Sequence, residues 1–248
     1  MNKEFTNNSS RPHGRAAHVH ARPLFVLIAC EESQAETAAF RRLGHIAFSC
    51  DIQQCRQSGN PEWHIKGDVT PYLQGKKDFI LQTGDYCTVP GWDLIIAHPP
   101  CTYLCKAGSL HLYKNPNYYL NFKGKLFYIN LSRYQKLLEG RKFFMECLKS
   151  NAHYVAVENP IPMSLANLPP ASTFSCPSWY GVKYTKKTLY WLKNLPPLMA
   201  EFINSNPRCY VSSSRGKYRS RTFPQMADAI ARQWSEYILT EIENGKYS

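Results

Sequence analysis

One segment of the chain places a thiol where a catalytic nucleophile is expected. The apolar run Leu94–Ala97 predicts a buried strand, and two prolines follow it closely. Neither Pro99 nor Pro100 can continue a helix or donate to a sheet ladder, so the chain must turn at the end of this strand. Ligands bind at such carboxyl ends in open α/β sheets. Cys101 comes next, and it is either a nucleophile or a small buried hydrophobe, the commonest role of a free cysteine.

A carboxylic acid occupies a similar position in a second segment. The β-rich run Tyr154–Val157 is followed by Glu158, Asn159 and Pro160. Parallel strands place their carboxyl ends along one edge of the sheet, so we expect Cys101 and Glu158 to face one pocket. Together they can supply a nucleophile and an acid. The alternative is that Glu158 and Asn159 only begin a turn.

Length and composition predict one globular domain, placed at residues 23–248 behind a disordered basic tail at 1–22. No run approaches the ~18 apolar residues of a membrane helix, and no signal peptide is evident. Nine cysteines at irregular spacing favour reduced thiols and a cytoplasmic location. The cysteine and histidine spacings match no zinc site, so no metal is expected.

The net charge of +12 is concentrated in two segments. Residues 106–149 hold nine Lys or Arg against two Glu, and residues 183–221 hold nine against one. Such segregation favours a surface that binds a polyanion, whereas charge that serves only solubility has no reason to cluster.

The order of the predicted elements indicates a parallel α/β sheet. A strand at 24–29, a helix at 33–43 and a strand at 46–50 form a βαβ unit. Four further strands are predicted, at 63–68, 94–97, 154–157 and 189–192. Two more helices are predicted at 134–150 and 225–242, the first with a core face made of Leu137, Leu138, Phe144, Met145 and Leu148. The tyrosine-rich, basic segment 103–130 is predicted to be an insertion over the active edge.

Over about residues 24–234, the chain resembles the DNA cytosine-5 methyltransferases, most of all their compact phage and prophage relatives, which lack a large target-recognition domain. The resemblance rests on six partial motifs in the family's order: Pro99-Pro100-Cys101, Val157-Glu158-Asn159-Pro160, Asp51, Gly67-Asp68-Val69, Tyr180-Gly181-Val182 with Lys186-Lys187-Thr188, and the stretch from Ser220 to Ala231. The resemblance implies a Rossmann-like S-adenosylmethionine-dependent methyltransferase fold, with a mostly parallel central sheet and helices on both faces. It also implies DNA methylation, as in restriction-modification, inside a bacterial or phage-infected cell.

The resemblance further assigns roles to residues. Cys101 is implied as the nucleophile that adds to carbon 6 of cytosine, and Glu158 as the donor to ring nitrogen 3, which requires a raised pKa; Pro100 and Asn159 belong to the same catalytic motifs. The residues implied for S-adenosylmethionine are Cys30, Glu31, Glu32, Ser33, Asp51, Ile52, Asp68, Val69, His98, Pro99 and Arg221. Those expected to contact nucleic acid are Lys123, Lys125, Lys186, Lys187, Arg215, Lys217 and Arg219.

The chain departs from the family in three places. The first-strand loop Cys30–Gln34 holds no glycine, and lysines replace the arginines expected near Lys186. Only about thirty residues separate Trp191 from Arg221, where the family inserts its recognition region. Target reading is therefore expected from the 103–130 insertion, from a protein partner, or from neither. A cytosine must also leave the base stack to react, and the tyrosines of the insertion either stack on bases or pack a small core of their own.

Three alternatives stay open. An amino-methyltransferase acting on adenine or cytosine carries an aromatic residue where this chain has Cys101, and a degenerate binder of nucleic acid or protein fits the loop without glycine. Thiol chemistry on a free pyrimidine nucleotide fits the short recognition region, although a single nucleotide does not require so much segregated positive charge.

Overall fold

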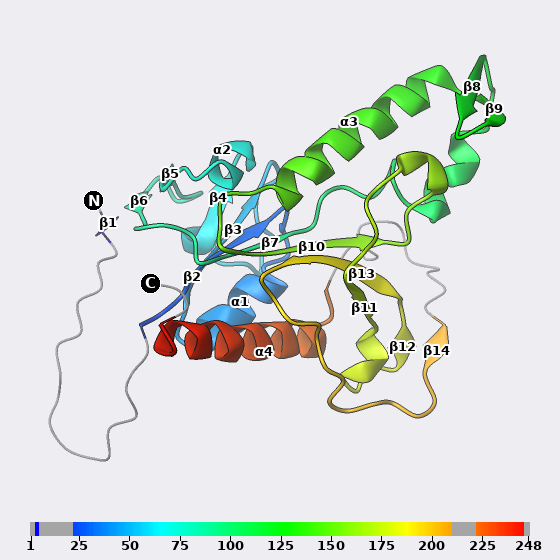
Figure 1. Ribbon diagram of the computed structural model, residues 1–248. Coiled ribbons are helices and arrows are strands. Elements are labelled where there is room, and N and C mark those ends of the chain that lie inside the picture. The colour runs from blue at the N-terminus through cyan, green and yellow to red at the C-terminus, as the bar shows by residue number, and fades with distance from the viewer. Residues whose placement is uncertain (1–2, 5–21, 210–221, 246–248) are drawn as a thin grey trace, which may run out of the picture.

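A seven-stranded sheet forms the centre of the molecule, and its strand order is β11-β13-β10-β7-β2-β3-β4 (Figure 1). The computed structural model describes residues 3–4, 22–209 and 222–245. The strands of the sheet are β2 Phe25–Ala29, β3 Ile46–Asp51, β4 His64–Lys66, β7 Leu94–Ala97, β10 Tyr154–Pro160, β11 Thr173–Ser175 and β13 Thr188–Lys193. Strands β4 to β10 along this order are parallel, and β13 pairs antiparallel with both β10 and β11.

The predicted fold class is confirmed, because helices cover both faces of this mostly parallel sheet. Helices α1 (Ala35–Arg42) and α4 (Pro224–Glu243) pack together on one face, and α2 (Thr70–Leu73) and α3 (Leu131–Leu148) lie on the other (Figure 1). Alternation along β2 explains the two cores, since neighbouring strand residues point to opposite faces. Val26 and Ile28 therefore join the α1/α4 core, while Leu27 joins the α3 core.

The strand order differs from that of a dinucleotide-binding domain. Such domains arrange six parallel strands in the order 3-2-1-4-5-6. Here the first five sheet strands along the chain follow that order, but an antiparallel strand, β13, separates β10 from β11. The chain connects outward in opposite directions from β2 and β7, so these neighbours flank the topological switch point where ligands bind.

Strand β10 is longer than the sequence predicts. Glu158, Asn159 and Pro160 were expected to follow the strand, but β10 continues through all three residues. Its parallel pairing with β7 ends at Val157, whereas its antiparallel pairing with β13 goes on to Pro160. Glu158 is therefore held in a strand that extends past the end of β7.

The 103–130 insertion contains two ordered elements. A short 3₁₀ helix, η2 (Lys106–His111), is followed by a hairpin of β8 (Tyr118–Phe122) and β9 (Lys125–Ile129). The hairpin turns on Lys123 and Gly124, which both have positive φ and thus suit a tight two-residue turn. It projects beyond the end of α3, away from the sheet (Figure 1).

The remaining elements are short. Strands β1 (Lys3–Glu4), β5 (Asp78–Ile80) and β6 (Tyr86–Thr88) form a small sheet, and β12 (Tyr184–Thr185) pairs with β14 (Arg208–Cys209). The 3₁₀ helices η1, η3 and η4 cover Pro61–Trp63, Ser164–Ala166 and Pro177–Trp179.

Some predictions fall outside the described residues. These are most of the 1–22 tail and four cationic positions, Arg215, Lys217, Arg219 and Arg221. The domain boundary at residue 23 stays a prediction. Among the described residues, no helix combines the length and apolar character that crossing a membrane requires. The eight cysteines whose side chains are described carry free thiols.

Two residues of helix α3 test how this helix packs in the α3 core. Phe144 is fully buried against Trp191, but Leu138, which the sequence places on the core face, is 41% exposed. Phe144→Ala is expected to lower the free energy of unfolding by about 3–5 kcal/mol through cavity formation. Leu138→Ala in the same helix is expected to cost less than about 1 kcal/mol. Urea unfolding measures both, and equal costs would contradict this orientation of α3.

Candidate active site

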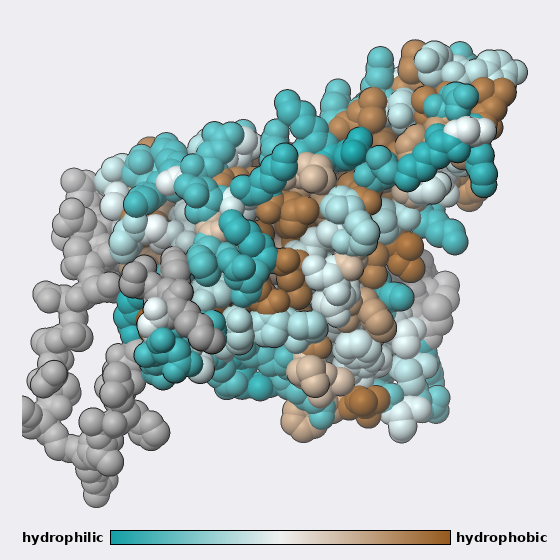
Figure 2. Space-filling view, in the orientation of Figure 1, coloured by the Kyte–Doolittle hydropathy of each residue, from teal (hydrophilic) through white to brown (hydrophobic). Residues whose placement is uncertain are grey.

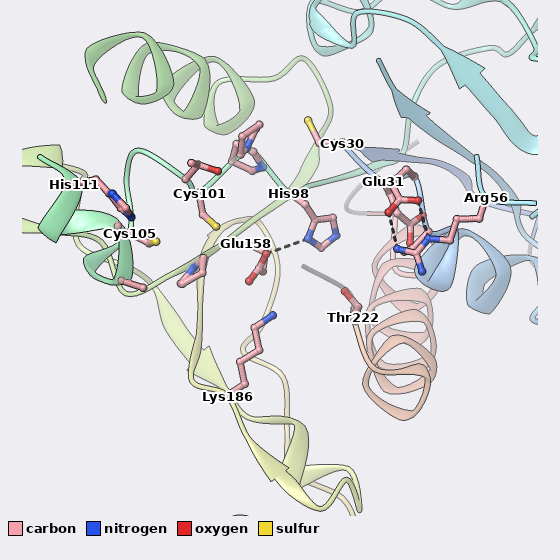
Figure 3. Close-up of a pocket in the computed structure, with 18 of the residues that line it drawn as sticks. Cys30, Glu31, Arg56, His98, Cys101, Cys105, His111, Glu158, Lys186 and Thr222 are labelled. Atoms are coloured by element: carbon pink, nitrogen blue, oxygen red, sulfur yellow. Dashed lines mark hydrogen bonds and ion pairs between the residues drawn. The ribbon is translucent and has the colours of Figure 1, made fainter. Parts of the chain in front are cut away.

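A cavity of about 560 Å³ opens at the carboxyl edge of the sheet, over the switch point (Figure 3). Its size is that of a small-molecule site. Ten predicted site residues line it: Cys30, Glu31, Glu32, Ser33, His98, Pro99, Pro100, Cys101, Glu158 and Lys186. Two further lining residues, Pro160 and Thr222, belong to motifs that carry the family resemblance. Seven others have no role predicted from the sequence: Arg56, Thr102, Cys105, Ala107, Gly108, His111 and Arg133.

Cys101 lies half-buried on a tight turn that directs its thiol into the cavity. The carbonyl of Cys101 accepts hydrogen bonds from the backbone N–H groups of Leu104 (3.0 Å) and Cys105 (2.9 Å). A hydrogen bond with the Cys105 thiol, together with burial, raises the pKa of Cys101. The thiol is therefore protonated at rest.

Glu158 reaches the same cavity and contacts His98 rather than standing alone. Its Oε2 lies 3.2 Å from Nδ1 of His98, while Nε2 of that ring lies 3.1 Å from Oε2 of Glu36 on α1. Glu36 is fully buried, and its Oε1 accepts a hydrogen bond of 3.0 Å from Thr222 just before α4. One imidazole thus joins carboxylates from two different elements.

The predicted protonation of Glu158 is wrong, because the charges around it favour the carboxylate. Burial works to raise the pKa of Glu158, but the hydrogen bond with His98 and the charge of Lys186 outweigh it, so the pKa is lowered. Burial works to lower the pKa of His98, but Glu36 and Glu158 raise it well above 6.5. The proton expected on Glu158 therefore resides on His98.

Asn159, the other predicted catalytic residue of this strand, faces away from the cavity wall and is completely buried. Its Nδ2 donates to the carbonyl of Pro99 at 3.3 Å. Its Oδ1 has no hydrogen-bond partner among the described residues. This side chain joins β10 to the turn that carries Cys101, so its contact is with the turn and not with the cavity.

The loop after β2 forms without glycine. Cys30 and Gln34 adopt positive φ (62° and 57°), a conformation that L residues rarely adopt. The side-chain amide of Gln34 is held by two hydrogen bonds with the backbone of Asn60. Its Nε2 donates to the Asn60 carbonyl at 2.9 Å, and its Oε1 accepts the Asn60 N–H at 2.7 Å. Side-chain hydrogen bonds here replace the conformational freedom of glycine.

Glu31 caps helix α1 from this loop. Its carboxylate accepts the backbone N–H groups of Glu36 (2.8 Å) and Thr37 (3.3 Å) and the Thr37 hydroxyl (2.7 Å). Burial and the charge of Glu36 raise the pKa of Glu31 to about 7. The amides at the start of α1 are thereby already engaged.

The neighbouring wall of the cavity carries an ion pair. Nε and an Nη of Arg56 donate to the two carboxylate oxygens of Glu32 at 2.7 and 2.5 Å. Both side chains are only 16% exposed, so the pair is held in a partly desolvated position. Ser33 lines the cavity beside it.

Four residues predicted to bind a cofactor lie beyond the cavity wall. Asp51 ends β3 and accepts the N–H of Gln53, and Ile52 is 77% exposed. Asp68 accepts the N–H of Thr70 at the start of α2, and Val69 is buried in the core. Burial, first of all, raises the pKa of Cys30, and the charges of Asp51 and Asp68 add to the effect.

The two predicted basic residues of the β12–β13 connection differ in position. Lys186 lines the cavity, and Figure 3 shows its side chain extending toward Glu158. Lys187 instead lies over the ring of Phe174, with Nζ 4.2 Å from the ring centre. The structure therefore brings Lys186, but not Lys187, to Cys101 and Glu158.

Some residues and contacts of the site have little or no signal in the sequence. Cys105 had a visible signal, its Cys-x3-Cys spacing from Cys101, but no reason to be functional. Glu36 and Thr222 meet across 186 residues of chain, and no local pattern predicts such a contact. Within the described part of the chain, no group of three His, Cys, Asp or Glu residues is placed to hold a metal ion.

The hairpin carries exposed aromatic and basic side chains. Tyr119 and Tyr128 face each other across the strands with ring centres 4.4 Å apart, and they are 62% and 47% exposed. Lys123 and Lys125 lie at the tip. From residue 94 to residue 138 the chain has six Lys or Arg and no Asp or Glu. Figure 2 shows hydrophilic and hydrophobic side chains mixed on this projection.

Solved structures, but neither protein-family models nor curated sequences, match this chain. Among solved structures, one assigned as a DNA modification methyltransferase of an E. coli prophage is 15% identical over 73% of this chain, with a TM-score of 0.41. A mutant of Spodoptera frugiperda DNMT2 is 14% identical over 75%, with a TM-score of 0.31. This chain covers about half of each, 52% and 56%.

The His98 cluster makes a pH prediction. His98 is expected to stay protonated well above pH 6.5, and Glu36→Gln is expected to lower its pKa by removing a carboxylate. Because the folded pKa is the higher one, the imidazolium stabilises the fold fully below pH 6.5, and that contribution is lost as pH rises through the folded value. Ring ¹⁵N NMR measures the titration. An ordinary histidine titration in the intact protein would contradict the cluster.

Proposed function

We propose that this protein is an S-adenosylmethionine-dependent DNA methyltransferase that methylates carbon 5 of cytosine through a covalent adduct at Cys101. The observation that carries the proposal is the shared cavity of Cys101 and Glu158, with a protonated His98 behind the carboxylate. A thiol adds to carbon 6 of a pyrimidine ring when the ring nitrogens accept a proton as charge develops. These three groups provide that pair of functions.

The cavity fits the cofactor in size, and polar groups lie in it and beyond one end of it. Asp51 and Asp68 lie beyond the cavity wall, and their carboxylates are suited to accept hydroxyl and amino hydrogens of a nucleoside that extends past that end. Ser33 and Arg56 are polar donors at the other wall. When bound, S-adenosylmethionine supplies the methyl group as an electrophile.

The protonation states before substrate binds determine which proton transfers each side chain must make. Cys101 must lose its proton to solvent as its sulfur bonds to carbon 6, and nitrogen 3 must gain one. Glu158 is anionic at rest, so it donates to nitrogen 3 only as it takes the proton of His98 Nδ1. The addition makes carbon 5 nucleophilic. After methylation, loss of the carbon-5 proton to solvent reforms the double bond between carbons 5 and 6 and releases Cys101 as a thiolate, which regains a proton from solvent. Nitrogen 3 returns its proton through Glu158 to His98.

The substrate base has to be unstacked to reach Cys101. The hairpin and η2 lie on the side of the cavity that Cys105 and Arg133 line, so a nucleic-acid strand at the cavity mouth is in reach of the hairpin. Exposed tyrosines there can stack on bases at about 1–3 kcal/mol each, and lysines neutralise phosphates. We propose that this projection supplies contacts that the short 191–221 region lacks.

A second candidate function is favoured by one observation. Glu31 occupies the amides at the start of α1, which are a natural site for an anionic group such as the methionine carboxylate. A nucleic-acid-binding protein with this fold and no cofactor is consistent with that arrangement. Calorimetry with S-adenosylmethionine separates the two, because only the methyltransferase binds it.

The proposed reaction is tested by nucleoside mass spectrometry of DNA incubated with the full chain and S-adenosylmethionine. We expect 5-methylcytosine with the intact protein, none with Cys101→Ala, and a loss of about 100-fold or more with Glu158→Gln. Cys176→Ser, at a half-buried cysteine outside the cavity, is the control that retains activity. Methylated adenine or amino-methylated cytosine that persists in Cys101→Ala would replace this proposal with an amino-methyltransferase.

The hairpin's role is tested by salt-dependent DNA binding. Replacing Lys123 and Lys125 together by Ala is expected to weaken binding and to reduce the slope of log K against log salt by about 1 for each phosphate that the variant no longer neutralises. The matched control replaces Lys66 and Lys77, two exposed lysines outside the hairpin, and removes the same charge. Equal slopes for the two double variants would contradict a hairpin contact.

A further inference from the structure

One wall of the cavity carries a cation, Arg133, that the reaction above does not use. Arg133 lies in the first turn of α3, and its side chain lines the cavity together with His111 of η2. Figure 3 shows His111 on one side of Cys101 and Arg56 on the other. The wall that carries Arg133 therefore lies across the nucleophile from the wall with the Arg56 ion pair.

The guanidinium of Arg133 is held in place by its neighbours. One Nη donates to the Thr102 carbonyl at 3.0 Å, and Cζ lies 4.4 Å from the centre of the Tyr103 ring. Gly108 lets η2 approach both groups, because a Cβ there would come 2.6 Å from the Thr102 carbonyl oxygen and 3.5 Å from an Arg133 Nη. A guanidinium fixed in this way loses little further side-chain freedom when it binds a ligand.

The positive charge of Arg133 differs from that of the other cations in the cavity. Arg56 is ion-paired with Glu32, and Lys186 extends toward Glu158 (Figure 3). Within the described part of the chain, no ion pair includes Arg133. Residues 94–138 also contain no Asp or Glu. The N–H groups of Arg133 that Thr102 does not use are therefore suited to an anionic ligand.

The position of Arg133 beside the nucleophile indicates which anion it binds. Its partner Thr102 directly follows Cys101 in the chain, so the guanidinium is anchored next to the residue that carries the thiol. In a pyrimidine nucleotide in the anti conformation, carbon 6 is the ring atom that faces the 5′-phosphate. A group that attacks carbon 6 thus approaches the same side of the nucleotide as a group that binds this phosphate. The planar fork of a guanidinium matches the oxygens of a phosphate.

We propose that Arg133 forms a phosphate subsite, which binds the 5′-phosphate of the pyrimidine nucleotide whose carbon 6 meets Cys101. The inference rests on the proposed function for the identity of the base. The bound phosphate orients the nucleotide so that carbon 6 enters the cavity toward the thiol. Both a DNA strand and a free pyrimidine nucleotide carry a phosphate at this position.

The subsite is tested by calorimetry of the full chain with two probes, deoxycytidine 5′-monophosphate and deoxycytidine. We expect the monophosphate to bind about 10-fold more tightly or better, because charge-assisted hydrogen bonds to phosphate are strong. Arg133→Gln is expected to remove this preference and to leave the affinity for deoxycytidine unchanged. Arg133→Lys is expected to keep part of the preference, because it keeps the charge and loses the fork.

The matched control is Lys142→Ala, which removes one charge from an exposed position of the same helix outside the cavity and is expected to keep the full preference. Equal binding of the two probes by the intact chain overturns the proposal. Equal weakening of both probes by Arg133→Gln also overturns it, because Arg133 then only supports the turn. If Arg133→Gln does not fold, Arg133→Lys decides: the preference must fall while the affinity for deoxycytidine stays.

A third probe separates the two sources of the phosphate. It is a short single-stranded oligonucleotide with one internal cytosine. If it binds more tightly than the monophosphate and Arg133→Gln weakens both, the subsite serves DNA. If the monophosphate binds more tightly, the subsite serves a free nucleotide, and the proposed reaction on DNA is contradicted. If the phosphate preference is present but no 5-methylcytosine forms, the proposed function fails and the subsite stands.

Discussion

A single protonated imidazole between two buried carboxylates determines the arrangement of the site. A buried carboxylate is tolerated only when it is paired, and removing one partner of such a pair costs about 3–5 kcal/mol. His98 pairs with Glu36 on α1 and Glu158 on β10, while Thr222 adds a hydrogen bond from the approach to α4. Elements that are far apart in the sequence are thereby fixed around the end of β7. The turn carrying Cys101 begins directly after this imidazole.

This constraint assigns the protons before any substrate arrives. Glu158 is held as the anion, because the neighbouring His98 carries the proton, and Cys101 is held as the neutral thiol. Glu158 and His98 lie within hydrogen-bond distance, so they can exchange a proton within the cavity without diffusion from solvent. The site thus places a neutral thiol in the same cavity as a carboxylate whose proton lies on the adjacent imidazole.

The sequence predicted the parts of the site that depend on local pattern. The apolar run Leu94–Ala97 and its two prolines were enough to place Cys101 at a strand end, because strand burial and proline chemistry are local. The charge of Glu158 was predicted wrongly, since it depends on contacts made across the fold. Leu138 was placed in the core by its spacing, although α3 exposes that position beyond the sheet. The sequence did not predict the hairpin of β8 and β9 within the 103–130 insertion, because its tyrosines are typical of both strands and loops.

The central claim is that Cys101 forms a covalent bond with cytosine, and a trapped adduct tests it most directly. DNA containing 5-fluorocytosine is incubated with the full chain and S-adenosylmethionine, because fluorine in place of the carbon-5 proton blocks release of the thiol after methylation. We expect a stable protein–DNA species in which the modified peptide carries the base on Cys101, and none with Cys101→Ala. An adduct on another residue, or methylated DNA with no adduct at all, would contradict the claim.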